Sequence, residues 1–140
     1  DVLDAGVDGG SSKRKVRRTC PMARDAVRVC NFRYGATGWA GLSQFQLQGK
    51  HIRRASIKLN ETYLGSKHRK TTCHELGHGL GLAHRSDPSS CMMQGSGVRA
   101  HPDAHDYRML EKIYGHTHAA DRTSSSDDGE WRIVTIKHPA

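Results

Sequence analysis

Aromatic residues, prolines and long hydrophobic runs are scarce in this sequence. Aromatic side chains account for 6% of the 140 residues, hydrophobic side chains account for 35%, and prolines number four. No stretch approaches the ~20 consecutive apolar residues that cross a bilayer, so we expect no membrane association. The length is that of one domain, and we therefore predict a single modest core that cross-links would help to stabilise.

Cysteine is also scarce, since only four are present and no two form a Cys-x-x-Cys pair. Cys20 and Cys30 flank a short loop, and Cys73 and Cys91 bracket a histidine-rich segment. Of the three ways to pair four cysteines, we predict a disulfide within each of these two pairs. The competing interpretation is metal binding by thiolates, which the missing Cys-x-x-Cys pair disfavours. Disulfides are typical of secreted proteins, so we expect an extracellular location. No signal peptide is visible, and we expect a processed form or a piece of a longer chain.

Acidic side chains are outnumbered by basic ones, with 14 Asp and Glu against 22 Lys and Arg and a net charge of +8. A basic run at residues 13–18 could bind nucleic acid or an anionic surface. The run lacks the aromatic platforms of single-strand binders and has no recognition-helix motif, so nucleic-acid binding is not favoured. We predict that residues 1–19 form a flexible basic arm, either simply solvated or a site of processing.

The most informative segment begins at His74 and reads His-Glu-Leu-Gly-His-Gly-Leu-Gly-Leu-Ala-His. On a helix, His74 and His78 lie on one face, one turn apart. Glu75 is displaced by about 100° around the helix, beside a metal rather than bound to it. Gly81 can take the positive φ that ends a helix, after which His84 can return as a third ligand. Three ligands and an open position describe a catalytic zinc site, whereas a structural site is closed by four. A helix with surface imidazoles would explain neither the glycine nor the third histidine.

The spacing H-E-x-x-H-x-x-G-x-x-H resembles the metzincin signature, which a methionine-containing turn completes. The segment Ser90-Cys91-Met92-Met93 resembles that turn. Met92 looks like its methionine, and Met93 is the second choice. In the family this residue packs beneath the metal as a hydrophobic base, so the resemblance implies a core position for Met92.

Flanking segments narrow the resemblance to the matrixins. Residues 106–115 resemble the last helix of a matrixin domain, and residues 38–47 and 55–63 resemble two strands of its sheet. Together with the cysteines that bracket the motif, these segments are similar to small secreted matrixin-type proteases of actinobacteria. The resemblance covers about residues 20–118. Residues 119–140 are predicted as a polar linker and tail.

The resemblance implies an α+β, metzincin-like fold with a twisted mixed sheet, an active-site helix, a Met-turn and a C-terminal helix. Alternating apolar residues predict strands, and 3–4 spacing of apolar residues predicts helices. The predicted strands cover residues 26–30, 42–47 and 52–59, and the predicted helices cover residues 69–81 and a segment opened by Pro102 and Asp103, with Tyr107, Leu110, Ile113 and Tyr114 as its apolar stripe.

Two terminal segments depart from the matrixin pattern. The residues before Val27 contain no amphipathic helix, so the N-terminal strand and helix of a matrixin domain are expected to be missing, or the chain to be a fragment. Their absence would leave one face of the sheet apolar and exposed. Trp131–Ile136 is strand-like and could pair with a sheet edge or remain an unstructured tail.

These patterns predict a zinc-dependent endopeptidase. Zinc held by His74, His78 and His84 would lower the pKa of water from about 15.7 to about 7. Glu75 would accept the proton as general base and later deliver it to the leaving amine. An edge strand over residues 42–47 could bind a protein or peptide substrate by β-augmentation. We expect a monomer, with a pro-segment or an inhibitor as further candidate partners. The other seven histidines are expected at the surface: His51, His68, His101, His105, His116, His118 and His138.

Two other classes of function compete with this one. Because the N-terminal elements are absent, the chain could be a catalytically impaired, metal-binding metzincin-like module. The basic arm would instead suit a protein that binds anions or nucleic acid.

Overall fold

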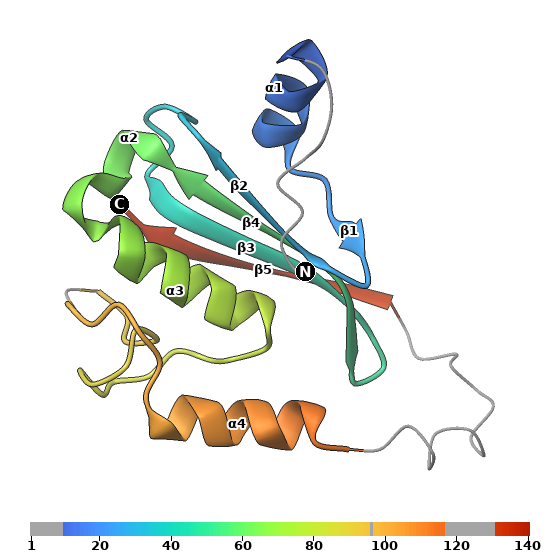
Figure 1. Ribbon diagram of the computed structural model, residues 1–140, viewed down its shortest axis with the longest axis vertical. Coiled ribbons are helices and arrows are strands. Elements are labelled where there is room, and N and C mark those ends of the chain that lie inside the picture. Colours follow the sequence, from blue (N-terminus) through green and yellow to red (C-terminus); the bar gives the residue numbers. More distant parts are fainter. Residues whose placement is uncertain (1–9, 96, 117–130) are drawn as a thin grey trace.

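The computed structural model describes residues 10–95, 97–116 and 131–140. It has an α+β fold in which a five-stranded mixed sheet is crossed by one long helix, with a second helix beyond it (Figure 1). In chain order the elements are α1 (Gly10–Thr19), β1 (Ala23–Arg24), β2 (Val27–Phe32), β3 (Trp39–Gln48), β4 (His51–Asn60), α2 (Glu61–Leu64), η1 (Gly65–Lys67), α3 (His68–Gly79), α4 (Ala104–Tyr114) and β5 (Trp131–Pro139). Among these residues no helix is long and apolar enough to cross a bilayer.

The sheet is built around β4, which pairs with three other strands. β2 runs parallel to β4, whereas β1 and β3 run antiparallel to it. β5 then pairs antiparallel with the other side of β3. The predicted fold class is confirmed, and the three predicted strands all form within one to three residues of their predicted ends.

The face of the sheet toward α3 holds most of the core. Val27, Phe45, Ala55, Ile57 and Leu59 are buried there, and Ala40 and Leu64 complete the cluster. The other face of the central strands carries Gln44, Gln46, Arg54, Ser56 and Lys58. The predicted apolar face is therefore only partly present: period-2 alternation puts these polar side chains on it, together with Leu42 on β3 and the exposed Trp131 and Ile133 on β5.

The segment before the sheet differs from the predicted flexible arm. Residues 10–19 form α1, which contains the whole basic run at residues 13–18. A disulfide joins Cys20, directly after α1, to Cys30 on β2. The Tyr34 hydroxyl donates a hydrogen bond to the Arg17 carbonyl. Lys and Arg are good helix formers, but this helix has no aliphatic stripe that would predict it. Residues 1–9 lie outside the described residues.

The tail contributes the last strand of the sheet. Of the two alternatives for Trp131–Ile136, pairing with a sheet edge is the one that forms, and β5 extends it to Pro139. The prediction that residues 42–47 are a free edge strand is therefore wrong, because β3 has a neighbour on each side. Val134 and Ile136 pack against the core and stabilise this pairing.

The two main helices form as predicted, with small differences. α3 ends at Gly79, two residues before its predicted end, and Gly81 has a φ of +99° in the turn that follows. α4 begins after Asp103, which caps it. In its predicted apolar stripe, Tyr107 and Tyr114 are 56% and 52% exposed. The apolar side of α4 is therefore narrower than predicted. Met109 and Leu110 pack against the cluster formed by Leu82, Cys91 and Met92.

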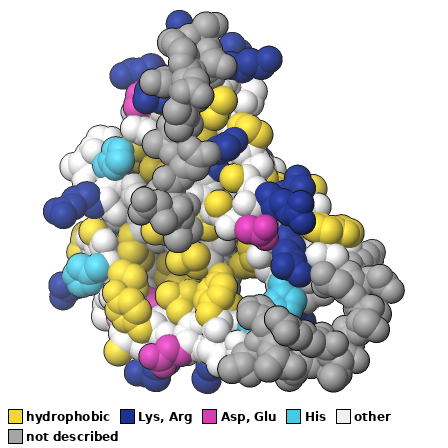
Figure 2. Space-filling model, turned by 45° about the vertical axis from the view of Figure 1, so that its right-hand side comes forward, with side chains coloured by type: hydrophobic (Ala, Val, Ile, Leu, Met, Phe, Trp, Pro, Cys, Tyr) yellow, Lys and Arg dark blue, Asp and Glu magenta, His cyan; other side chains and the backbone are white. Residues whose placement is uncertain are grey.

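A separate apolar pocket lies away from the three motif histidines. Phe45, Ile52, Gly81 and Ile113 are among its lining residues, and none of the motif histidines is. Hydrophobic side chains gather in the middle of the face shown in Figure 2, with Lys and Arg around them. This pocket is therefore not part of the histidine site.

Candidate metal centre

The helix α3 buries the first three polar residues of the motif. His74 and Glu75 are completely inaccessible to solvent, and His78 is 1% exposed. A β-carbon at Gly77 would lie 2.3 Å from the sulfur of Met92, so only glycine allows Met92 this close to the helix. Buried imidazoles and a buried carboxylate are costly unless they have partners, so their surroundings decide what the site can bind.

The structure brings His74, His78 and His84 together as predicted. The Nε2 atom of His74 lies 3.0 Å from that of His78 and 3.1 Å from that of His84. The Nδ1 atoms of His74 and His78 each lie 2.8 Å from a main-chain carbonyl oxygen, of Cys91 and of Leu82 respectively. A carbonyl oxygen only accepts hydrogen bonds, so both Nδ1 atoms carry the proton and both Nε2 atoms present lone pairs.

Lone pairs that face one another at this distance repel, and a cation between them would remove the repulsion. Tetrahedral zinc with bonds of about 2.05 Å would separate its nitrogen ligands by about 3.3 Å, close to what this cluster offers. Ligating histidines in proteins commonly donate their second ring N–H to a carbonyl group, as His74 and His78 do. The three imidazoles therefore fit a zinc ion, and together they form one group with metal-ligand geometry.

Burial also keeps the imidazoles in their metal-binding form. Desolvation lowers the pKa of His74 to about 3 and the pKa of His78 to about 4. Desolvation likewise lowers the pKa of His84, with a further contribution from the charge of Lys70. Neutral imidazole is the form that binds a metal, so the cluster is ready to do so near neutral pH.

Glu75 lies beside this cluster and contacts β3. Its Oε2 atom is 2.5 Å from the Ser43 hydroxyl oxygen, which donates to it, and its Oε1 atom is buried with no hydrogen-bond partner. Burial raises the pKa of Glu75 to about 7, opposed by the Ser43 hydrogen bond and the charge of Lys70. A carboxyl group with a pKa near the working pH is suited to general acid–base chemistry.

Two residues that position Glu75 are not predicted from the sequence. A β-carbon at Gly41 would lie 2.5 Å from the Glu75 side chain, so glycine leaves the room that the carboxylate occupies. Ser43, two residues further along β3, is on the same face of the strand. Their period-2 spacing indicated a shared face, but only the packing of α3 on β3 reveals that this face meets Glu75.

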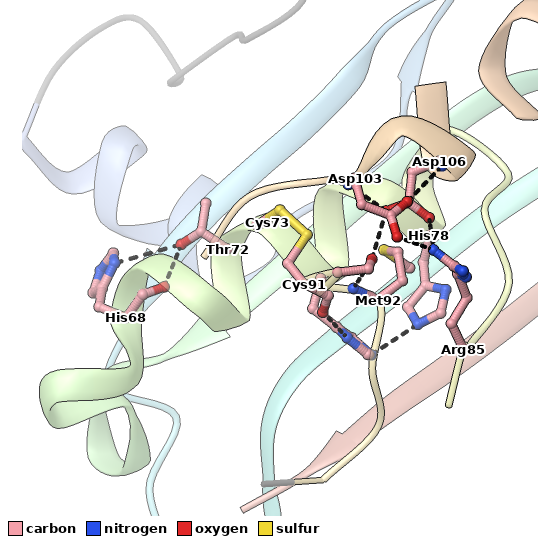
Figure 3. Close-up of a disulfide and its surroundings, with 11 residues drawn as sticks. His68, Thr72, Cys73, His78, Arg85, Cys91, Met92, Asp103 and Asp106 are labelled. Carbon is pink, nitrogen blue, oxygen red and sulfur yellow. Dashed lines mark hydrogen bonds and ion pairs between the residues drawn. A yellow bond between two sulfur atoms is a disulfide. The ribbon is translucent and has the colours of Figure 1, made fainter. Parts of the chain in front are cut away.

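Met92 occupies a core position, as the resemblance implies. It is fully buried and packs with Leu82 and Cys91. The predicted disulfide between Cys73 and Cys91 is formed and joins α3 to the segment that contains Met92 (Figure 3). Cys73 directly precedes His74, and the Cys91 carbonyl accepts the hydrogen bond from the His74 ring. The disulfide therefore holds the main chain of His74 close to the carbonyl that orients its side chain.

A polar network that the sequence did not predict anchors the same segment to α4. The Ser90 hydroxyl accepts from the Met92 N–H at 2.8 Å and donates to Asp106 at 2.5 Å. Asp103 and Asp106 bond to each other's main-chain N–H groups in a capping box, and Arg85 pairs with Asp103 (Figure 3). The partners that join the two segments, Ser90 with Asp106 and Arg85 with Asp103, are sixteen and eighteen residues apart in the sequence. No local sequence pattern therefore predicts these contacts.

A fourth histidine lies next to the cluster, contrary to prediction. His138 is 6% exposed, and its ring centroid is 4.5 Å from that of His74. Burial lowers its pKa to about 4, and its Nδ1 atom has no hydrogen-bond partner. Of the other histidines predicted at the surface, His68, His101, His105 and His116 are exposed, His51 is half-buried and His118 lies outside the described residues.

Comparison with known proteins yields one family. The family model of the matrixins matches residues 37–115, which is more than half of the 140 residues and runs from the residues before β3 to the end of α4. No curated protein matches the chain.

Proposed function

We propose that the chain, which belongs to the matrixin family, is a zinc-dependent endopeptidase that cuts peptide bonds in proteins or peptides. The observation that carries this proposal is the convergence of three Nε2 atoms beside a buried carboxylate. The family supports a zinc metallopeptidase domain, and the arrangement of the polar groups supports the assignment of individual roles.

The metal ligands in this proposal are His74, His78 and His84. Zinc held by them would supply a Lewis acid that lowers the pKa of water to about 7 and polarises the scissile carbonyl. The main-chain carbonyls of Cys91 and Leu82 keep two of the rings in the required tautomer. Met92 is fully buried against α3 at Gly77, the residue before His78.

Glu75 is the general base in this proposal. Ser43 holds its Oε2 atom, which leaves Oε1 to take a proton from the attacking water and to deliver it to the leaving amine. The oxygen is buried and has no competing hydrogen-bond donor in the described residues. The two disulfides and the absence of a membrane-crossing helix in the described residues support a secreted protein.

The competing function is a metal-binding module without catalysis. It is supported by β5, which occupies the edge of β3 that a peptide substrate would need. The two functions differ in one outcome, since only an endopeptidase loses an activity when Glu75 is changed.

Substitution of Glu75 by Gln tests the proposal. Glu75→Gln removes the proton acceptor but keeps the side-chain shape and all three imidazoles, so we expect one zinc per chain and a loss of about 10²–10⁴-fold in kcat. Hydrolysis is measured on a peptide library, with a chelator that abolishes it and zinc that restores it. Because β5 lies along β3, each measurement is repeated in Ile136→Asp, which places a charge on the buried side of β5 and loosens it.

The exposed His101 supplies the matched control. His101→Ala should keep both zinc and activity, since its side chain is exposed. If no zinc-loaded form cleaves any peptide, even with β5 loosened, the endopeptidase proposal fails. Cleavage that persists in Glu75→Gln would contradict the role given to Glu75.

A further inference from the structure

The last strand of the sheet lies where an extended peptide would be expected to bind. β5 pairs with β3 from Gln48, opposite Trp131, to Trp39, opposite Pro139. β3 is the strand that carries Gly41 and Ser43, the two residues that contact Glu75. Addition of a strand to a sheet edge is a common mode of peptide recognition. β5 therefore fills the edge of the sheet that is nearest to the proposed general base.

The inward face of β5 is aligned with the metal centre. Ile136 is paired with Ser43, and His138 is paired with Gly41. Gly41 is the residue whose missing side chain leaves room for Glu75. The register thus places His138 across from the Glu75 carboxylate, on the same face of the sheet.

His138 is placed as a metal-site residue rather than as a core residue. Its ligand atom, that of His74 and that of Glu75 all lie within 4.8 Å of one another. Its Nδ1 atom is buried without a partner, which is costly for a polar atom that could be solvated. An apolar side chain at this position would avoid that cost, so packing alone does not account for a histidine here.

We propose that β5 occupies the substrate-binding edge of β3 in place of a peptide, and that His138 fills the open side of the metal centre. This inference rests on the proposed endopeptidase function and describes how that site is regulated. The folded chain is then a latent form, because a catalytic zinc site needs an open position and a substrate needs the edge of β3. β5 lies outside residues 37–115, the part that matches the matrixin family, so the match to the family does not account for this strand.

β5 competes with peptide substrates for the edge of β3, and its attachment to the same chain favours β5. A tethered segment acts at an effective concentration on the order of mM, well above that of most peptide substrates. Val134 and Ile136 add contacts with the core that hold it in place. Access to the metal centre therefore depends on release of β5.

Two isoleucines on opposite faces of β5 give a matched test. Ile136 packs against the core, whereas Ile133 is 64% exposed. Ile136→Asp should loosen β5, and Ile133→Asp makes the same chemical change on the outer face. His138→Ala opens the metal centre without disturbing the strand, so it remains informative if Ile136→Asp fails to fold.

The first readout is the affinity of the zinc-loaded full chain for a short peptide hydroxamate, measured by calorimetry. If β5 leaves the edge of β3 about a tenth of the time or less, Ile136→Asp should raise the affinity about tenfold or more. His138→Ala should also raise it, because the hydroxamate can then reach the open side of the metal centre while β5 stays paired. Ile133→Asp should leave it unchanged. Equal affinity in the unsubstituted chain and in both opening variants would overturn the proposal.

The second readout is hydrogen exchange of the β5 amides. Saturating hydroxamate peptide should remove protection from residues 131–139 and leave β4 protected, whereas unchanged protection of β5 would overturn the proposal. Peptide hydrolysis separates this inference from the function on which it rests. Variants that bind the hydroxamate more tightly but cleave nothing would support β5 as occupant and refute the endopeptidase. An unsubstituted chain that cleaves as fast as both opening variants would support the endopeptidase and refute the role of β5.

Discussion

At the residue scale, the deciding detail is which nitrogen of each imidazole carries the proton. The carbonyl groups of Cys91 and Leu82 assign it to Nδ1 in His74 and His78, and this leaves the Nε2 lone pairs pointing together. The spacing of the histidines predicts that they share a face of a helix. It cannot predict the carbonyls, because these come from chain segments whose path depends on the turn after α3.

The residues that surround the Glu75 carboxylate cannot be predicted from the sequence for a related reason. Gly41 and Ser43 lie more than thirty residues before Glu75, and His138 lies more than sixty residues after it. Their position next to it depends on the pairing register of β3 with β5 and on the packing of α3 against the sheet. The alternation of side chains along β3 and β5 predicts which residues share a face, but it does not predict that this face lies next to a carboxylate.

Substitution of Gly41 tests the positioning of Glu75. The new β-carbon of Gly41→Ala would lie 2.5 Å from the carboxylate and must displace it. A displacement of about 1 Å can cost about 10²-fold in rate, so we expect kcat to fall by that order while zinc binding is retained. Gln44→Ala, on the opposite face of β3, should have little effect. The measurement is peptide hydrolysis with zinc content, and full activity in Gly41→Ala would contradict the geometry of the site.

At the element scale, α3, α4 and the segment around Met92 are held as one unit. The disulfide from Cys73 to Cys91 joins the first and the last of these, and the Ser90–Asp106 hydrogen bond joins α4. The sequence predicts both helices and the disulfide, since their signals are local. It does not predict α1, whose polar composition lacks an apolar stripe, or the pairing partner of β5.

Asp103 links the stability of α4 to pH. Burial by itself raises the pKa of this carboxyl group. The hydrogen bonds that it accepts from the Asp106 N–H and from Arg85 have the larger opposite effect, so the pKa lies below its usual value. The charged form is therefore favoured by folding. The stabilisation is fully present above about pH 4, the usual carboxyl pKa, and is lost as the pH falls toward the folded value.

Asp103→Ala removes this N-cap. We expect the free energy of unfolding at pH 7 to fall by about 1 kcal/mol, a typical value for loss of a capping carboxylate. The difference between the variant and the parent should narrow as the pH drops below about 4, because the parent then loses the same interaction. Urea unfolding at several pH values measures it, and a difference that grows in acid would contradict the sign of the linkage.

At the scale of the whole molecule, the fold combines a matrixin core with a strand from outside it. The matched residues 37–115 include β3, β4, α3 and α4, while β2 and β5 complete the sheet on either side. The sequence predicts the fold class because the metal motif is specific to the metzincins, which share this α+β fold. It leaves the role of the last segment open, because a single short strand has no preferred partner until the sheet edge is known.

The central claim is that three histidines hold one zinc ion. The most direct measurement is the zinc stoichiometry and dissociation constant of the full chain and of His74→Ala, His78→Ala and His84→Ala, with His101→Ala as control. We predict one zinc per chain, a loss of affinity of about 100-fold or more in each of the three variants, and no change in the control. Zinc binding in His84→Ala as tight as in the unsubstituted chain would contradict the claim.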